Sequence, residues 1–216
     1  MKVAALIPAR RNSRRLADKN WQQVGSLPLW RHAIEHAKTS AVCDPIVLST
    51  DDDRILFGQH DLGGAMTIVQ PKFEQTYDVM RQVVAHADTE LQRLGHDVEA
   101  ICLLQPTSPL RIGADVAACV AMLDQRGVES VVSVTEGNDD IVFQVRHANR
   151  LEKVPSVVVP NGAIYCIKTA VLRAGGHWYG DYSYAYPMPK ERSIDINTEL
   201  DLEMARVAWE RLLPKC

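Results

Sequence analysis

The stretch Val3-Ala4-Ala5-Leu6-Ile7-Pro8-Ala9-Arg10-Arg11-Asn12-Ser13-Arg14-Arg15-Leu16-Ala17-Asp18-Lys19-Asn20 decides how the rest of the chain is interpreted. Its apolar beginning, residues 3–7, predicts a buried β-strand that Pro8 ends. The following residues 9–20 carry five cations and one carboxylate. A donor-rich loop directly after a first strand is how α/β proteins bind phosphates, because backbone N–H groups surround the anion and Arg or Lys neutralises it. The alternative is a solvated basic loop.

Length and charge set the limits for the whole chain. Its 216 residues suit one large domain, residues 1–216, with a sizeable core. The net charge of −3 makes the basic loop a local feature, so we expect no nucleic acid partner. No apolar run approaches the ~20 residues of a membrane span, and none resembles a signal peptide. The five cysteines lack Cys-x-x-Cys spacing, which favours buried, reduced thiols of a cytoplasmic protein over disulfides or zinc.

Strand and helix patterns alternate over residues 28–134. Helices separating the strands imply βαβ units, right-handed crossovers and a predominantly parallel, twisted sheet with helices on both faces. Strands are predicted at 46–48, 66–69, 100–104 and 130–134, and helices at 28–41, 79–95 and 112–126, with a short helix after Asp53.

After Thr135 the alternation stops, and we expect 136–190 to be a small excursion or a dimerisation region. Within and beyond it, the pattern predicts irregular or edge structure at 136–160, a strand at 163–167, a short helix at 168–174, a loop at 175–187 and a last helix at 199–213. Thr198 can cap that helix, with Asp201 three residues later in a near capping box.

Three stretches are expected to meet: the basic loop, residues 103–111 and residues 192–202. Loops after the first and fourth predicted strands of a parallel sheet open on the same edge and can line one crevice. Asp195 and Asn197 alternate in an extended segment, so their side chains share a face. Such an oxygen pair suits Mg²⁺, which also binds substrate phosphates. The alternative is that residues 195–201 only cap the following helix, where acidic side chains favour the helix dipole.

Together, these stretches resemble the acylneuraminate cytidylyltransferases, which include the CMP-sialic acid synthetases and enzymes for other nonulosonic acids. Residues 104–111 match LQPTSPLR in full, and residues 161–165 match NGAIY in full. The other similarities, in the family's order, are residues 7–20 with IPAR-x-GSK…KN, 49–52 with STDD and 194–201 with DIDTELD. The resemblance implies the three-layer, mostly parallel α/β fold of the nucleotide-diphospho-sugar transferase (Rossmann-like) type.

The resemblance also implies a reaction, in which the anomeric hydroxyl of an acidic 2-keto sugar attacks the α-phosphorus of CTP and pyrophosphate leaves. Positioning and charge stabilisation would carry the rate, and Mg²⁺ would be the cofactor. The implied catalytic residues are Arg10, Lys19, Gln105 and Asp195. The implied nucleotide-binding residues are Ala9, Arg10, Asn12, Ser13, Arg14, Lys19 and Asn20. Gln105, Thr107, Ser108 and Asn161 would bind the sugar, and Asp195 and Asn197 the metal.

The chain departs from the family pattern at several of these positions. Asn12 replaces a glycine but tolerates left-handed backbone, and Arg14 replaces a lysine with a larger head group. Asn197 replaces an aspartate, which removes one charge from the metal site. Gln70 stands where the family has an arginine, and residues 136–160 are short for the family's dimerisation arm. A nucleotide-binding partner or regulator with little catalysis is therefore the alternative function.

Two further patterns need an interpretation. His32-Ala33-Ile34-Glu35-His36 matches H-x-x-E-H, but it follows a nucleotide-type loop, and we expect its histidines to face solvent by chance. A group of aromatic residues lies near the predicted loop: His177, Trp178, Tyr179, Tyr182, Tyr184 and Tyr186. We expect them to form a subunit contact, in a homodimer, rather than to stack on substrate. No G-x-G-x-x-G follows the first strand, which argues against a dinucleotide oxidoreductase.

Overall fold

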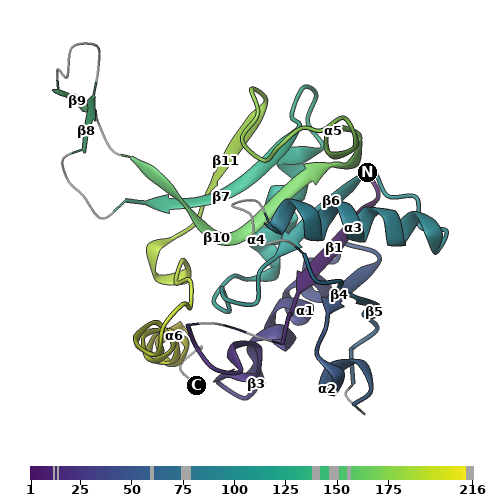
Figure 1. Cartoon of the computed structure of the whole chain (residues 1–216). Coiled ribbons are helices and arrows are strands. Elements are labelled where there is room, and N and C mark those ends of the chain that lie inside the picture. Colours follow the sequence, from purple (N-terminus) through teal and green to yellow (C-terminus); the bar gives the residue numbers. More distant parts are fainter. Residues whose placement is uncertain are drawn as a thin grey trace.

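The computed structural model describes residues 1–11, 13, 15–58, 61–73, 79–137, 142–145, 151–154 and 157–212. Within them, the main sheet has seven strands in the order β11-β7-β10-β6-β1-β4-β5 (Figure 1). Strand β1, Val3–Pro8, lies inside the sheet and pairs in parallel with β4, Ile46–Thr50, and with β6, Ala100–Leu104. Strand β5, Met66–Val69, continues the parallel arrangement at one edge.

The other half of the sheet contains its one reversed strand. Strand β10, Val158–Lys168, runs antiparallel to β6 and to β7, Ser130–Glu136, whereas β11, Ser183–Pro187, is parallel to β7. The sheet is therefore mostly parallel, as predicted. The predicted loop at 175–187 is wrong in its last part, because Tyr184 and Tyr186 lie in β11, where alternating aromatic side chains suit a pleated edge.

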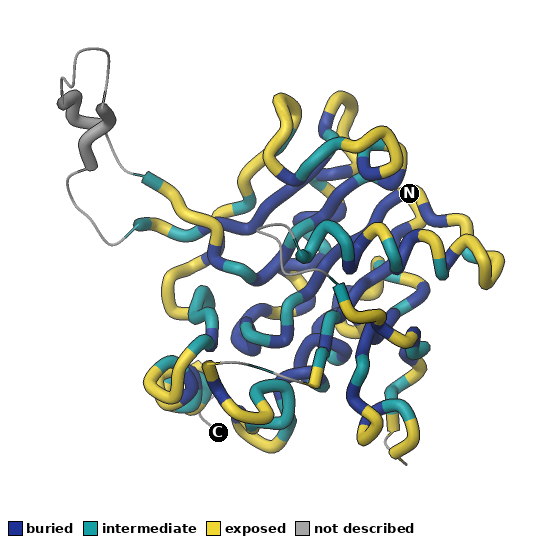
Figure 2. Tube along the Cα trace, viewed as in Figure 1, coloured by how far each residue is buried: buried dark blue, intermediate teal, exposed yellow. Residues whose placement is uncertain are grey.

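Helices cover both faces of the sheet, which confirms the three-layer prediction. Successive β1 side chains point to opposite faces. Val3, Ala5 and Ile7 pack with α1, Leu29–Ser40, and α4, Gly113–Leu123. Ala4 and Leu6 pack with α3, Val79–Arg93, and α5, Thr169–Arg173. Figure 2 shows the buried centre of the sheet and the exposed loops around it.

The C-terminal helix α6, Glu199–Leu212, forms a separate small core. Its Leu202 and Ala205 pack with Val24 and Leu29, so the helix lies against the segment that follows the basic loop. That segment contains the 3-10 helix η1, Lys19–Trp21, and the paired strands β2, Gln23–Val24, and β3, Leu27–Pro28. Two further short helices among the described residues are α2, Asp53–Leu56, and η3, Lys190–Arg192.

The region predicted as an excursion, residues 136–190, has two parts. Strands β8, Val142–Val145, and β9, Leu151–Val154, form an antiparallel pair that projects away from the main sheet (Figure 1). Strands β10 and β11 belong to the main sheet itself. The prediction of edge structure at 136–160 therefore describes β8 and β9, while β10 begins within the same stretch and runs through the sheet.

The buried polar groups partly differ from expectation. His32 and His36 are buried against the core, so the prediction that they face solvent is wrong. The cysteines of the described residues are free: Cys102, Cys119 and Cys166 are buried and Cys43 is half-buried, as predicted, whereas Cys216 lies outside the described residues. None of the helices in the described ranges combines the length and apolar composition needed to cross a membrane.

Candidate active site

The loops after β1 and β6 open into one cavity of about 330 Å³ at the carboxyl edge of the sheet. This is the shared crevice that the parallel arrangement predicts. Of the predicted site residues, Arg10, Ser13, Lys19, Asn20, Gln105 and Thr107 line it. Arg15, Gln70, Val79 and Met80 also line it and were not selected as site residues from the sequence. Asn12 and Arg14 lie outside the described residues.

Backbone contacts hold the basic loop over the sheet. Ala9 is fully buried: its N–H donates to the Ser49 carbonyl at 2.8 Å and its carbonyl accepts from Thr50 Oγ1 at 2.6 Å. Asn20 Nδ2 donates to the Arg10 carbonyl at 2.8 Å, which joins the two ends of the loop. Ala9 and Asn20 therefore fix the loop's shape, a role that their residue types alone did not indicate.

Asp52, from the Ser-Thr-Asp-Asp segment, binds the end of the same loop through hydrogen bonds. It accepts from Trp21 Nε1 at 2.9 Å and from Arg54 Nη2 at 2.7 Å, and it caps α2 by accepting from the Arg54 N–H at 3.0 Å. The Arg54 hydrogen bonds lower the pKa of the Asp52 carboxyl to about 2. Because Trp21 is the last residue of η1, which begins at Lys19, this buried carboxylate holds the end of the short helix that carries Lys19.

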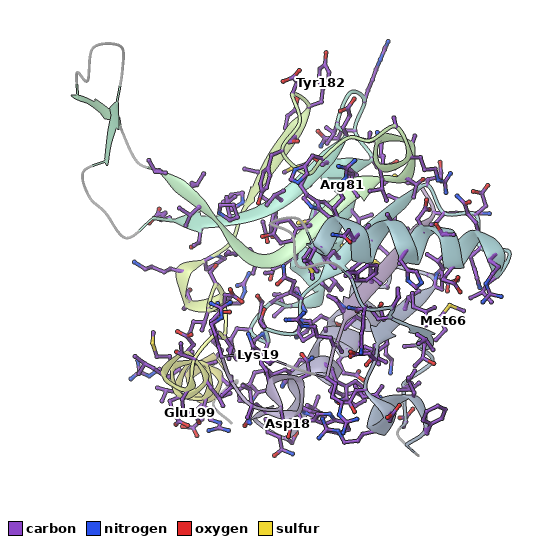
Figure 3. All side chains as sticks on the ribbon, in the orientation of Figure 1. Asp18, Lys19, Met66, Arg81, Tyr182 and Glu199 are labelled. Carbon is purple, nitrogen blue, oxygen red and sulfur yellow. The ribbon has the colours of Figure 1, made fainter. Side chains whose placement is uncertain are left out.

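Lys19 connects the basic loop to the segment of residues 194–198 that precedes α6, and Figure 3 shows Lys19 on the side of the molecule where α6 begins. Its Nζ donates to the Ile196 carbonyl at 2.9 Å and to Asn197 Oδ1 at 3.3 Å. Burial lowers the pKa of Lys19, while the charge of Asp195 opposes that shift. A lysine held this way places one cation at the wall of the cavity and beside the predicted metal ligand.

The predicted metal pair has a different arrangement from the one expected. Asn197 Nδ2 donates to Asp195 Oδ2 at 2.7 Å, so its carbonyl oxygen faces Lys19 instead of sharing a site with Asp195. The opposite amide orientation would put NH₂ against a cation and oxygen against a carboxylate. Asn197 is therefore a bridge between Lys19 and Asp195 in this structure, and its role as a metal ligand stays a prediction.

Of these two residues, Asp195 has a carboxylate oxygen that is suited to bind a cation. Its Oδ1 is buried and has no hydrogen-bond partner among the described residues. It packs against Gly162, where a Cβ would lie 3.3 Å from the Asp195 carboxyl carbon and where φ is +77°. The described residues contain no group of three His, Cys, Asp or Glu side chains that could hold a metal. The donor set fits an Mg²⁺ that takes most of its ligands from phosphates and water.

The β6 loop meets the same segment. The Ile196 N–H donates to the Thr107 carbonyl at 2.8 Å, which brings two of the three predicted stretches into direct contact. Ser108, predicted to bind the sugar, is fully buried. Neither Ser108 Oγ nor Thr107 Oγ1 has a hydrogen-bond partner among the described residues.

A second cavity of about 430 Å³ shares Met80 and Gln105 with the first. Its other lining residues are Leu103, Tyr165, His177, Trp178 and Tyr179. Trp178 is buried in the core with its ring 5.7 Å from that of Tyr165, so it does not form the expected subunit contact. Tyr182 and Tyr184 are exposed, and Figure 3 shows Tyr182 far from Lys19.

Asn161 has partners that leave little of its amide for a sugar. Its Oδ1 accepts from Ser133 Oγ at 2.6 Å and from the Ala163 N–H at 3.1 Å, while Nδ2 donates to Ser193 Oγ at 2.9 Å. The side chain is buried between β7, β10 and the segment leading to Asp195. These contacts indicate a structural role for Asn161, and its role in sugar binding stays a prediction.

Comparisons with known proteins identify the family to which the chain is similar. A family model described as Cytidylyltransferase matches residues 4–201. The N-acylneuraminate cytidylyltransferase of Escherichia coli O18:K1:H7 is 30% identical, over 94% of this chain and 51% of its own length. The CMP-N,N'-diacetyllegionaminic acid synthase of Legionella pneumophila is 29% identical, over 97% of both chains.

The chain spans about half the length of the N-acylneuraminate cytidylyltransferases that it matches. Among solved structures, a CMP:2-keto-3-deoxy-manno-octonic acid synthetase complexed with CTP has a TM-score of 0.70 at 15% identity, covering 99% of this chain and 100% of its own. That likeness supports the fold, which is the nucleotidyltransferase arrangement predicted from the sequence.

Proposed function

Because this chain belongs to the cytidylyltransferase family, we propose that it transfers CMP from CTP to a nonulosonic 2-keto sugar acid and releases pyrophosphate. The observation that carries the proposal is the pair of adjoining cavities that meet at Gln105. One cavity has a basic wall suited to a triphosphate, and the other has an aromatic wall suited to a sugar with apolar substituents. Relatives named for neuraminic, pseudaminic and legionaminic acids support the substrate class.

In the proposed reaction, the anomeric hydroxyl oxygen forms a bond to the α-phosphorus of CTP. The bond from that phosphorus to the bridging oxygen of the β-phosphate breaks, pyrophosphate leaves with the electron pair, and the hydroxyl proton passes to water. The protein supplies little covalent chemistry in such a transfer, so positioning and charge stabilisation carry the rate. Water-excluded donors aimed at the developing charge are the main means of achieving this.

Arg10 and Lys19 are the groups that we assign to the phosphates. Both line the first cavity, and Lys19 is fixed by its bonds to the Ile196 carbonyl and to Asn197. A cation that is held before the substrate binds costs no reorganisation during the reaction. Ser13 and Arg15 line the same wall and would contact the remaining phosphate oxygens.

Mg²⁺ would supply positive charge to the triphosphate, with the Asp195 carboxylate as its protein ligand. The unpartnered, buried Oδ1 of Asp195 supports this assignment. Asn197 fixes the rotation of that carboxylate by donating to Oδ2, which leaves Oδ1 as the atom turned away from the hydrogen bond. One carboxylate gives weak coordination, so we expect Mg²⁺ to bind tightly only together with CTP.

Gln105 is the residue that we assign to the sugar, because it lines both cavities. The second cavity adds the rings of Tyr165, His177 and Tyr179, which offer apolar faces and polar edges. Thr107 lies at the first cavity beside Gln105. This wall suits acyl or methyl substituents of a nonulosonic acid. The assay described below identifies which acid is the substrate.

The test is a pyrophosphate-release assay with CTP, Mg²⁺ and a panel of nonulosonic acids, run beside calorimetric titration of CTP. Release with at least one acid, and none without an acid, supports the proposal. Silence with every acid, while CTP still binds, supports the alternative of a nucleotide-binding partner or regulator. Parallel reactions with GTP, ATP and UTP decide the choice of nucleotide.

We also propose that the protein works as a cytoplasmic homodimer. The free thiols of the described cysteines suit a reducing compartment. The exposed rings of Tyr182 and Tyr184 are side chains of the kind that interfaces favour. Light scattering, which measures the molar mass in solution, tests whether such a dimer forms.

A further inference from the structure

Arg111, at the end of the β6 loop, is a fully buried cation whose hydrogen bonds go to neutral groups. Nη1 donates to the Ala163 carbonyl at 2.5 Å and to the Gln105 carbonyl at 3.2 Å, and Nε donates to His36 Nδ1 at 3.3 Å. Nη2 has no hydrogen-bond partner among the described residues. Arg111 therefore joins three elements, the β6 loop, β10 and α1, without a carboxylate hydrogen-bonded to it in the described structure.

Such a buried charge is costly, because burial removes it from bulk solvent and no carboxylate is hydrogen-bonded to it among the described residues. Burial lowers the pKa of Arg111 to about 10. The carboxylate of Asp115 acts on Arg111 through its charge, but its oxygens accept from Arg192 at 2.6 Å, from Tyr186 at 3.1 Å and from the Ile112 N–H at 3.0 Å. An apolar side chain would fill this position at lower cost, so the guanidinium indicates a role other than stability.

His36 completes the arrangement as an acceptor. Its Nδ1 can accept from Arg111 only when the ring is neutral and its proton is on Nε2. Burial and the neighbouring Arg111 charge hold the pKa of His36 well below its usual value, so the ring stays neutral. His32, one helical turn earlier, bonds through Nε2 to the Val24 carbonyl at 2.7 Å. The H-x-x-E-H pattern thus serves buried hydrogen bonds, not a metal.

We infer that Arg111 is the positioning residue for Gln105, with His36 fixing the orientation of its guanidinium. A single nitrogen, Nη1, bonds the carbonyl of Gln105 and the carbonyl of Ala163. Ala163 follows Gly162, against which Asp195 packs. The guanidinium therefore sets the separation between the residue assigned to the sugar and the backbone that supports the carboxylate assigned to the metal. The inference rests on the proposed function for the identity of the two substrates.

The expected kinetic signature separates the substrates. In Arg111→Lys, a compact ammonium replaces the fork and cannot reach both carbonyls and His36 together. We expect KM for the sugar acid to rise and kcat/KM for it to fall on the order of 10- to 100-fold, the scale of a displacement of about 1 Å. KM for CTP should stay within about twofold, because Arg10 and Lys19 come from the β1 loop, whereas the hydrogen bonds of Arg111 named above go to the β6 loop, β10 and α1. A purely structural residue would lower the amount of active enzyme and leave both KM values unchanged.

A pair of His36 variants gives the matched control. This pair also tests the positioning role of Arg111 where an Arg111 variant fails to fold. His36→Asn keeps an acceptor oxygen near the position of Nδ1, whereas His36→Leu removes it at similar size. The inference predicts that Asn retains most of the sugar specificity and that Leu reproduces the loss seen in Arg111→Lys. Equal KM values for the sugar in both His36 variants and the wild type would overturn it.

Hydrogen exchange of the intact protein tests the inference without turnover. In His36→Leu, amides of residues 105–111 and 161–165 should exchange faster than in His36→Asn, and those of residues 3–9 should not change. Unchanged exchange in both segments would reject the positioning role. Absence of turnover by the wild type with every acid would instead reject the proposed function, and the exchange result would still stand.

Discussion

Asn197→Asp is the substitution that examines the proposed metal site most closely. It restores a second carboxylate at the position where the amide now donates 2.7 Å to Asp195 Oδ2 and accepts at 3.3 Å from Lys19 Nζ. Without a metal, the new carboxylate should therefore repel Asp195 and attract Lys19. With Mg²⁺ present, the two carboxylates can share the cation.

The distances give the size of the effect. At an effective dielectric constant of about 20, unit charges at the Asp195 contact repel by about 6 kcal/mol and those at the Lys19 contact attract by about 5 kcal/mol. The lost hydrogen bond from the amide costs about 1 kcal/mol more. The variant should thus be about 2 kcal/mol less stable in EDTA, which lowers Tm by roughly 4–8 °C in a domain of this size. Mg²⁺ at about 100 times its Kd would return about 2.7 kcal/mol.

The assay is calorimetric melting of the wild type, Asn197→Asp and Asn197→Ala in EDTA and in millimolar Mg²⁺, without CTP. Asn197→Ala is the control, because it loses the hydrogen bond without adding charge. Only Asn197→Asp should regain its Tm with Mg²⁺, and in initial-rate titrations it should need less Mg²⁺ than the wild type. An identical Mg²⁺ response in all three proteins would show that the cation does not bind beside Asp195.

Three further outcomes are expected. Lys19→Ala should lower kcat/KM for CTP by about 10²- to 10³-fold and Lys19→Arg by less, because a fixed cation is lost in the first variant and kept in the second. Since burial lowers the pKa of Lys19, the affinity of the wild type for CTP should decline with rising pH before an ordinary lysine would lose its proton. A CTP affinity that stays constant through that pH range would contradict this. The Asp52 pKa of about 2 is depressed, so its stabilisation is present above the unfolded pKa of about 3.9 and is lost as pH falls through about 2. Wild type and Asp52→Asn should therefore differ in Tm at pH 6 and converge near pH 2; a constant difference would contradict this. Replacing Tyr182 and Tyr184 by Ser should shift light scattering from dimer toward monomer, and a wild type that is already monomeric at high micromolar concentration would remove the proposed interface.

Much of the fold could be predicted because each central strand is a short apolar run bounded by helical periodicity. Residues 100–104 are apolar throughout, and the structure buries every one of them in β6. The loops after β1 and β6 then had to share an edge. Strand β11 could not be predicted in this way, because Tyr184 is exposed and Tyr186 only partly buried, so no apolar face marked the strand.

The site was predicted less completely, because side-chain partners decide its roles. Asn161 and Asn197 are both amides in motif-like segments, and only the contacts show that one holds Ser133 and Ser193 while the other bridges Lys19 and Asp195. Residue type and spacing do not indicate which end of an amide faces which partner. The same holds for His36, whose buried ring accepts a hydrogen bond from the Arg111 guanidinium.

Phosphorus NMR of the reaction products tests the central claim most directly. The protein is incubated with CTP, Mg²⁺ and the acid that gives the fastest pyrophosphate release, and the phosphorus signals are followed with time. The account predicts loss of the three CTP signals and equal appearance of pyrophosphate and of one phosphodiester that joins CMP to the sugar. Formation of free CMP with pyrophosphate, or of CDP with phosphate, would contradict transfer to a sugar hydroxyl.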